Sequence, residues 1–305
     1  MDSMNIEYSV VSVSSPGVHL TAGDDAAAID LCRKCNQFAA GMKKRHPKRF
    51  GYFASLPLPA VEASLKEIET AFAEGADGIV FLTNFHGVYL GDRKFDRVMD
   101  ELNRRKAKIF IHPTCGCLSP AGHTGAGTAN TLQANPLFHV MPNPVVEFLF
   151  DTSRCIANLF LSGTVRRCPD ITWLISHMGG SLAPIVSRFA AFAPLVGDPQ
   201  YIRDDLSEDE VVEIFNQRFF FDMAGWSFPR QWKMLTYGLG IGFDRITYGS
   251  DFPFTNAMAV AAFGDKMDEG VKEWKERVTE DTYYANAAKL FGLAGVDKSD
   301  RKAVL

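Results

Sequence analysis

The sequence predicts an α/β protein, a (β/α)8 TIM barrel from which the first strand is missing. Seven apolar runs of strand length alternate along the chain with segments of helical periodicity. Strands that are apolar almost throughout, each followed by a helix, are typical of a parallel sheet covered on both faces. A closed barrel of this type has eight such units. Because the chain opens directly on a strand, we expect the absent unit to be the first one.

The first part of the chain contains three predicted strands and two predicted helices. The run at 6–13 (IEYSVVSV) ends at a Ser-Pro-Gly turn, which stops a strand. The segment 24–42 is predicted to be helical because its apolar side chains recur at helical spacing, at Ala28, Leu31, Cys35, Phe38 and Met42. Strands are then predicted at 50–58 and 77–85. Between them one helix face repeats at i, i+4, i+7 and i+11, through Val61, Leu65, Ile68 and Phe72.

The rest of the chain continues the same alternation after one interruption. A helix at 94–106 and a strand at 108–114 (KIFIHPT) precede a long stretch, 115–143, that is rich in Gly, Pro, Thr and Asn. Loops of this length inside a compact domain are usually functional. The remaining predicted elements are a helix at 144–167, strands at 171–177, 219–225 and 244–254, and a closing helix at 282–292. No linker divides the chain, so we predict one barrel domain over 1–292 and a solvated tail over 293–305.

The composition excludes several classes of protein. The 305 residues are 47% hydrophobic and 22% charged, the balance of a globular protein in solution, and the net charge is −4. A nucleic-acid binder or a polybasic membrane anchor would need an excess of Lys and Arg. No apolar run approaches the roughly 18 to 20 residues of a membrane span, and the N-terminus does not resemble a signal peptide. Six Cys are too few for a disulfide scaffold, so we expect a cytosolic protein with reduced thiols.

Reactive side chains stand at the ends of four consecutive predicted strands: His112, His177, Asp222 and Asp251. In an α/β barrel the active site lies at the carboxyl ends of the strands, so these side chains can converge on one point. Imidazole nitrogens and carboxylate oxygens are suitable ligands for Zn²⁺ and other divalent ions. The pattern therefore predicts a metal site at this rim.

The residues around these strand ends resemble a known family. The matching strings are FIHPT (110–114), LISHMGGSLAPIVSRF (174–189), FFDMAG (220–225) and YGSDFPF (248–254). They are similar to the amidohydrolase superfamily, and more narrowly to its decarboxylase branch, which includes aminocarboxymuconate-semialdehyde decarboxylase and γ-resorcylate decarboxylase. The stretch 128–180 most resembles the fungal 6-methylsalicylate decarboxylases. The closing YYANAAKLFG, with Asn286, resembles the last helix of the family.

The resemblance implies a role for each site residue and a barrel of the metal-dependent amidohydrolase type. His112 is expected to be a metal ligand, and Asp251 a second ligand. His177 is the expected catalytic histidine beside the metal. Arg188 matches an arginine that reaches the substrate, in some relatives from the neighbouring subunit. The expected metal is Zn²⁺, with Mn²⁺ as the alternative, and the expected assembly is a homodimer.

One feature of the family is missing from this sequence. The first strand of the family carries an H-x-H or E-x-H pair that completes the metal site, whereas no two of the seven His in this chain are two residues apart. We therefore expect either that the chain starts at an internal Met or that the protein has lost this strand. A site with only His112 and Asp251 should hold a metal poorly, because stable sites use three or more protein ligands.

The predicted activity is the metal-dependent, non-oxidative decarboxylation of a small aromatic carboxylic acid. The resemblance points to 6-methylsalicylate, an acid of polyketide secondary metabolism, as the substrate and to 3-methylphenol and carbon dioxide as the products. Either Asp251 or His177 can donate the proton to the ring carbon, and Phe85, Trp226 and Phe252 are candidates to wall an aromatic pocket. One alternative is a hydrolase, such as a lactonase, that uses a metal-activated water. The other is a truncated, non-catalytic paralogue that binds a partner subunit.

Overall fold

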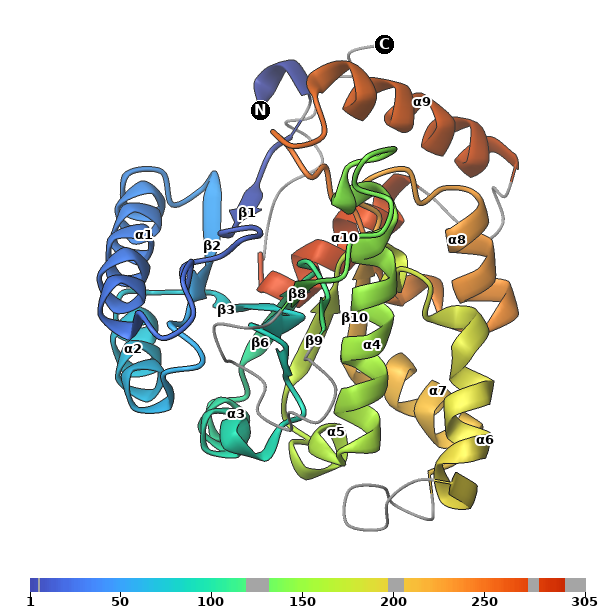
Figure 1. The fold of residues 1–305 in the computed structure, drawn as a ribbon. Coiled ribbons are helices and arrows are strands. Elements are labelled where there is room, and N and C mark those ends of the chain that lie inside the picture. The colour runs from blue at the N-terminus through green and yellow to red at the C-terminus, as the bar shows by residue number, and fades with distance from the viewer. Residues whose placement is uncertain (5, 119–131, 197–205, 274–279, 294–305) are drawn as a thin grey trace.

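The core of the protein is one sheet of seven parallel strands (Figure 1). The computed structural model describes residues 1–4, 6–118, 132–196, 206–273 and 280–293. In their spatial order the strands are Ser9–Val11 (β1), Phe50–Ser55 (β2), Gly78–Leu82 (β3), Lys108–His112 (β6), Thr172–Ile175 (β9), Phe219–Asp222 (β10) and Ile246–Thr247 (β11). This is also their order in the chain, as expected for a barrel built from successive strand–helix units.

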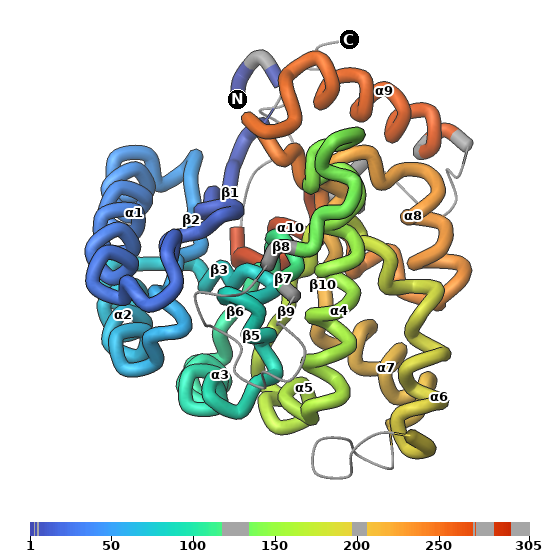
Figure 2. Tube along the Cα trace, in the orientation of Figure 1, coloured from blue at the N-terminus to red at the C-terminus, as the bar shows by residue number. Residues whose placement is uncertain are grey.

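Helices accompany the strands of this sheet. They are Asp25–Arg45 (α1), Val61–Ala73 (α2), Asp96–Arg104 (α3), Glu147–Leu161 (α4), Thr164–Arg167 (α5), Val186–Val196 (α6), Glu208–Arg218 (α7), Arg230–Lys233 (α8), Ala257–Glu273 (α9) and Glu280–Phe291 (α10). Figure 2 shows α1 and α2 on one side of the sheet, α6 and α7 on the other, and α9 across the top of the view. Among the packed pairs, α1 lies on β2, α7 on β10 and α10 on β11.

The strands pair in this way because they are apolar on both faces. Every residue of β3 (GIVFL) is buried, and so is every residue of β10 (FFFD). A strand that is apolar on both faces is unfavourable at a water-exposed surface. It is stable only in a sheet whose two faces are both covered. The largest fully buried side chains include Trp173 on β9 and Phe219 on β10, whose rings stack with centroids 5.8 Å apart. The main core thus lies between the sheet and its helices.

The prediction of a barrel-type fold that is one strand short is confirmed. The sheet is curled like a barrel, but β1 and β11 are its two edges, and within the described residues no strand joins them. The limits of the domain stay a prediction, because most of the predicted tail, 294–305, lies outside the described residues.

Several predicted elements differ in detail from those observed. The strand predicted over 77–85 is two strands, β3 and the short Asn84–Phe85 (β4), which forms a hairpin with Val88–Tyr89 (β5). The helix predicted over 144–167 divides into α4 and α5 at Gly163, whose φ of +73° ends the first helix. The long loop begins with Cys117–Leu118 (β7), which pairs with Leu132–Gln133 (β8), and residues 119–131 lie outside the described part.

Among the described residues, His177–Val196 is apolar and long enough to cross a membrane by length and composition alone. The structure breaks this segment into two 3-10 turns, His177–Gly179 and Ala183–Ile185, followed by α6, which contains Pro194. The 11 residues of α6 span about 16 Å, roughly half of a hydrocarbon core. We therefore assign the segment to the barrel.

Candidate metal centre

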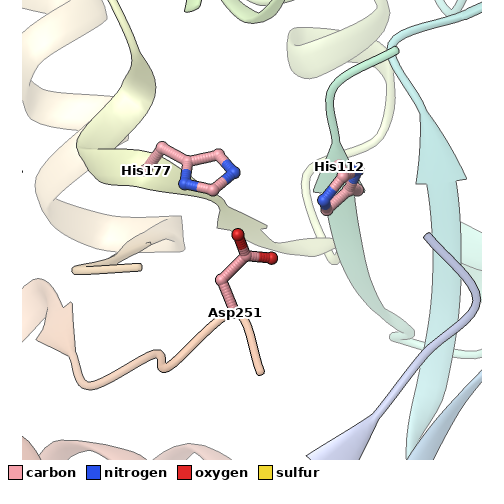
Figure 3. A group of neighbouring side chains, drawn as sticks. All are labelled: His112, His177 and Asp251. Atoms are coloured by element: carbon pink, nitrogen blue, oxygen red, sulfur yellow. The ribbon is translucent and has the colours of Figure 1, made fainter. Parts of the chain in front are cut away.

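Three of the predicted residues meet at the carboxyl edge of the sheet (Figure 3). His112 is the last residue of β6, His177 follows β9, and Asp251 follows β11. One ligand atom of each, an imidazole nitrogen or a carboxylate oxygen, lies within 4.8 Å of the other two. His112 is buried, and the other two are half-buried. Two nitrogens and a carboxylate form a donor set that fits Zn²⁺ or Mn²⁺.

The hydrogen bonds of the two imidazoles leave the correct nitrogen free for a metal. His112 Nδ1 lies 2.7 Å from the carbonyl oxygen of Pro113, and His177 Nδ1 lies 3.1 Å from that of Ala224. A carbonyl only accepts, so each Nδ1 carries the proton and each neutral ring keeps its lone pair on Nε2. Histidine ligands in metal sites are commonly oriented by such a backbone carbonyl.

Electrostatics also favour the neutral, ligating form of His112. Burial disfavours the charged ring, and the neighbouring His177 adds to this effect. Together they lower the pKa of His112 to about 4, against the smaller opposing effect of the bond to Pro113. The ring is therefore neutral at physiological pH, so it does not have to lose a proton before binding a cation.

The structure corrects the prediction for Asp222, which does not belong to this group of donors. Its Oδ1 accepts hydrogen bonds from the backbone N–H of His177 at 2.9 Å and of Ala224 at 3.0 Å. Its carboxylate is buried, and burial raises its pKa. Asp222 thus bonds the end of β10 to the backbone of His177 and to Ala224, whose carbonyl orients the His177 ring. Position at a strand end does not reveal whether a side chain faces the rim or the backbone of the next strand.

Left-handed backbone conformations cluster at this site. His177 and Met178 have a φ of +52°, and Asp251 has a φ of +55°. Each such non-glycine residue costs of order 1–3 kcal/mol, and such residues often cluster at active sites. Gly180 completes the turn after His177, with a φ of +63°, and a Cβ there would come within 2.4 Å of the carbonyl oxygen of Leu149. The SHMGG string is therefore needed to turn the chain sharply and present the His177 ring.

Ser14 also lies at this site, and the sequence analysis missed it. Its Oγ is 3.5 Å from His112 Nε2, the nitrogen that faces the metal position. The Ser-Ser-Pro-Gly segment was interpreted only as the stop of the first strand. The feature of the sequence that points to Ser14 is its position directly after a strand of the barrel, where polar residues face the active site.

Among the described residues, no hydrogen bond or ion pair joins the side chains of the other predicted residues to the three donors. Arg188 is exposed on α6, and its guanidinium lies 5.1 Å from the ring centre of Phe192. Of the three aromatic candidates for the pocket wall, Phe85 is buried against the core residues Phe81 and Phe95, and core packing is the usual role of such side chains. Trp226 and Phe252 are 59% and 55% exposed, so they are free to contact a ligand or another surface.

The comparison with known proteins agrees with this architecture. Residues 1–293 match the Amidohydrolase family. A decarboxylase of Aspergillus niger, yanB, is 33% identical over 301 residues, which cover 95% of this chain and 76% of the relative. The 6-methylsalicylic acid decarboxylase acuB of Aspergillus aculeatus is 31% identical over 293 residues, covering 95% and 83%.

A solved structure supports the fold independently. The dihydroxybenzoic acid decarboxylase of a Polaromonas species, crystallised with manganese and the inhibitor 2-nitroresorcinol, aligns with a TM-score of 0.74 and 21% identity. The alignment covers 96% of this chain and 84% of that one. Three findings agree: the match over residues 1–293, the identity to the fungal relatives, and the parallel sheet with its donors at the carboxyl edge. This chain therefore belongs to the amidohydrolase family.

Proposed function

We propose that this protein is a metal-dependent, non-oxidative decarboxylase of a small aromatic acid, and that it converts 6-methylsalicylate to 3-methylphenol and carbon dioxide. The observation that carries the proposal is the convergence of His112, His177 and Asp251 within 4.8 Å. It occurs in a chain that is 31–33% identical to two fungal decarboxylases, one of them a 6-methylsalicylic acid decarboxylase. The convergence also favours catalysis over the alternative of an inert paralogue.

His112 and Asp251 are the proposed metal ligands, and because they are only two, we expect weaker metal binding than in a site with three protein ligands. The Nε2 lone pair of His112 is available because Nδ1 carries the proton. The Asp251 carboxylate is steadied by the Thr255 hydroxyl, which lies 3.2 Å from Oδ2. When bound, the metal supplies Lewis-acid charge that orients the acid and stabilises its negative oxygens. Manganese in the Polaromonas enzyme makes Mn²⁺ a reasonable choice beside Zn²⁺, and the preference for zinc stays a prediction.

His177 is the proposed proton donor. In its protonated form the ring carries one proton on Nδ1, held by the Ala224 carbonyl, and a second on Nε2, the nitrogen on the site side of the ring. This second proton is the one that it delivers. In the reaction this proton goes to the ring carbon that bears the carboxylate. The bond between that carbon and the carboxyl carbon then breaks, its electron pair restores the aromatic ring, and carbon dioxide leaves. The step needs no oxidant. Asp251 remains the alternative donor.

Product analysis tests the proposed reaction. The protein, loaded with Mn²⁺ or Zn²⁺, is expected to release one carbon dioxide and one 3-methylphenol for each 6-methylsalicylate consumed. The methyl ester of the acid is the matched control, because it cannot lose carbon dioxide directly. A ring-opened product from an aromatic lactone, without gas, would instead support the hydrolase alternative. Absence of both reactions in the metal-loaded protein would contradict an enzymatic role.

A homodimer is proposed for the assembly, with Arg188 acting across its interface. The exposed face of α6 supports this proposal, because Phe192, Leu195 and Val196 are 46%, 75% and 77% exposed beside Arg188. Apolar groups gathered on one surface usually mark an interaction site. The cytosolic location and the link to polyketide metabolism stay predictions.

Complementation tests the role of Arg188. The Arg188→Ala and His177→Asn variants are expected to be inactive alone and to recover activity when refolded together, because one mixed site then contains both side chains. The homodimer predicts about twice the monomer mass in solution by light scattering. A monomer, or an Arg188→Ala variant with full activity, would contradict the cross-subunit role.

A further inference from the structure

Ser14 lies in the segment 12–24 that connects β1 to α1, and its side chain reaches the candidate metal centre. Its Oγ lies 3.5 Å from His112 Nε2, the atom that would bind a metal. Among the described residues, this nitrogen is the only polar partner of the Ser14 side chain. The contact places a hydroxyl group directly beside one of the proposed ligands.

The segment that carries Ser14 is held firmly in place. The neighbouring hydroxyl of Ser15 makes a 2.8 Å hydrogen bond with that of Thr114, two residues after His112. Gly17 has a φ of +79° and approaches Leu82 so closely that a Cβ would lie 2.7 Å from Leu82 Cδ1. These two contacts attach the segment to the ends of β3 and β6.

A pair of histidines, His19 and the half-buried His86, provides the next anchor. His19 is 5% exposed and uses both ring nitrogens: Nε2 is 2.9 Å from Asp25 Oδ1, and Nδ1 is 2.9 Å from His86 Nε2. The carboxylate only accepts, so His19 donates from Nε2, and in the neutral ring its Nδ1 accepts a hydrogen bond from His86 Nε2–H. His86 sits in the tight β4–β5 turn with a φ of +51°. The segment is therefore rigid, and the Ser14 hydroxyl has a defined position.

The hydrogen bonds available to the Ser14 hydroxyl indicate its role. Without a metal, Ser14 O–H can donate to the lone pair of His112 Nε2. Ligation uses that lone pair, and the hydroxyl then lacks an acceptor among the described residues. A donor left unpaired in a half-buried site is unfavourable, so the site gains from a ligand that brings an oxygen to this place. The carboxylate and ring hydroxyl of an aromatic acid both supply such an oxygen.

We propose that Ser14 is a substrate-binding residue whose hydroxyl donates a hydrogen bond to an oxygen of the aromatic acid beside His112. The inference rests on the proposed function and deepens it by naming a side chain that selects the acid. It also explains why the segment after β1 is anchored at Thr114, Leu82 and His86: a rigid donor loses little entropy on binding.

Ligand affinity of the Ser14→Ala variant tests the proposal. The probes are 2-nitrophenol, whose nitro group replaces the carboxylate and cannot leave as carbon dioxide, and benzoate, which has no ring hydroxyl. Titration calorimetry on the Mn²⁺-loaded protein is expected to show about tenfold weaker binding of 2-nitrophenol to Ser14→Ala. Metal content per chain should be unchanged. The control is Ser9→Ala, at the start of β1, where the side chain makes no polar contact among the described residues; we expect wild-type affinity.

The outcomes separate this inference from the function on which it rests. A similar loss with both probes means that Ser14 binds the carboxylate position, and a loss with 2-nitrophenol alone means that it binds the ring hydroxyl; both support the proposal. Unchanged affinity for both probes overturns it while leaving the proposed function intact. Loss of metal from Ser14→Ala overturns it too, because Ser14 would then be a metal ligand. A wild-type protein that binds neither probe overturns both.

Discussion

Replacing His177 with Asn is expected to slow carbon dioxide release by about 10²- to 10⁴-fold, the usual contribution of a positioned acid or base. The shorter amide can still donate a hydrogen bond towards the Ala224 carbonyl, which His177 Nδ1 contacts at 3.1 Å. It has no ionisable nitrogen at the Nε2 position, so it cannot deliver a proton to the ring carbon. We expect the substrate to bind and the turnover number to fall, with metal content per chain unchanged.

The matched control for this prediction is His46→Asn. His46 is exposed at the end of α1 and lies outside the site, so its variant should have wild-type turnover. Single-turnover carbon dioxide release and elemental analysis of the same samples are the measurements. If His177→Asn loses its metal together with its activity, His177 is a ligand and Asp251 becomes the proton donor. If turnover is unchanged, His177 has no part in the chemistry.

Replacing His112 with Ala is expected to weaken metal binding by more than about 100-fold, since even the residues that only orient a ligand contribute 10- to 100-fold. His112 is 7% exposed, its Nδ1 is bonded to the Pro113 carbonyl, and its Nε2 is one of the three donor atoms that lie together at the site. Decarboxylation should disappear with the metal. Competition with a fluorescent chelator measures the affinity, and elemental analysis measures the metal content.

Loss of folding is the main competing explanation for the His112 variant, because a buried side chain is removed. Far-ultraviolet circular dichroism and the unfolding midpoint of the same protein distinguish the two. A folded variant without metal supports the assignment. A folded variant that still holds one metal per chain shows that the metal is bound elsewhere, and it would remove His112 from the mechanism.

Most of the fold could be predicted because its signals are local. The apolar runs that became β2, β3 and β6 are buried in the sheet, as their composition requires. The helix from Val61 was located by its repeating apolar face. Errors arose where local geometry overrides pattern. Gly163 divides a continuous helical pattern, and the apolar run 77–85 breaks at Thr83, after which β4 leaves the sheet to form a hairpin with β5.

The site was predicted less completely, since the direction of a side chain depends on neighbouring strands. His112 and Asp251 follow their strands and face the rim, as expected. Asp222 also stands at a strand end, yet its carboxylate accepts hydrogen bonds from two backbone N–H groups. Ser14 has no motif of its own, because a serine in a Ser-Ser-Pro-Gly run looks like an ordinary turn residue, and only its position after a barrel strand points to the site.

The sequence by itself determined the alternation of strands and helices, the family and the candidate metal-binding side chains, because apolar runs, helical spacing and the strings at the strand ends are all local patterns. Only the tertiary structure decided which of them meet. His112 and His177 are 65 positions apart in the chain, and Ser14 and His112 are 98 apart. Their contacts depend on the curl of the sheet and on the left-handed turns at His177 and Asp251. Such long-range geometry is set by packing of the whole sheet, which no local pattern encodes.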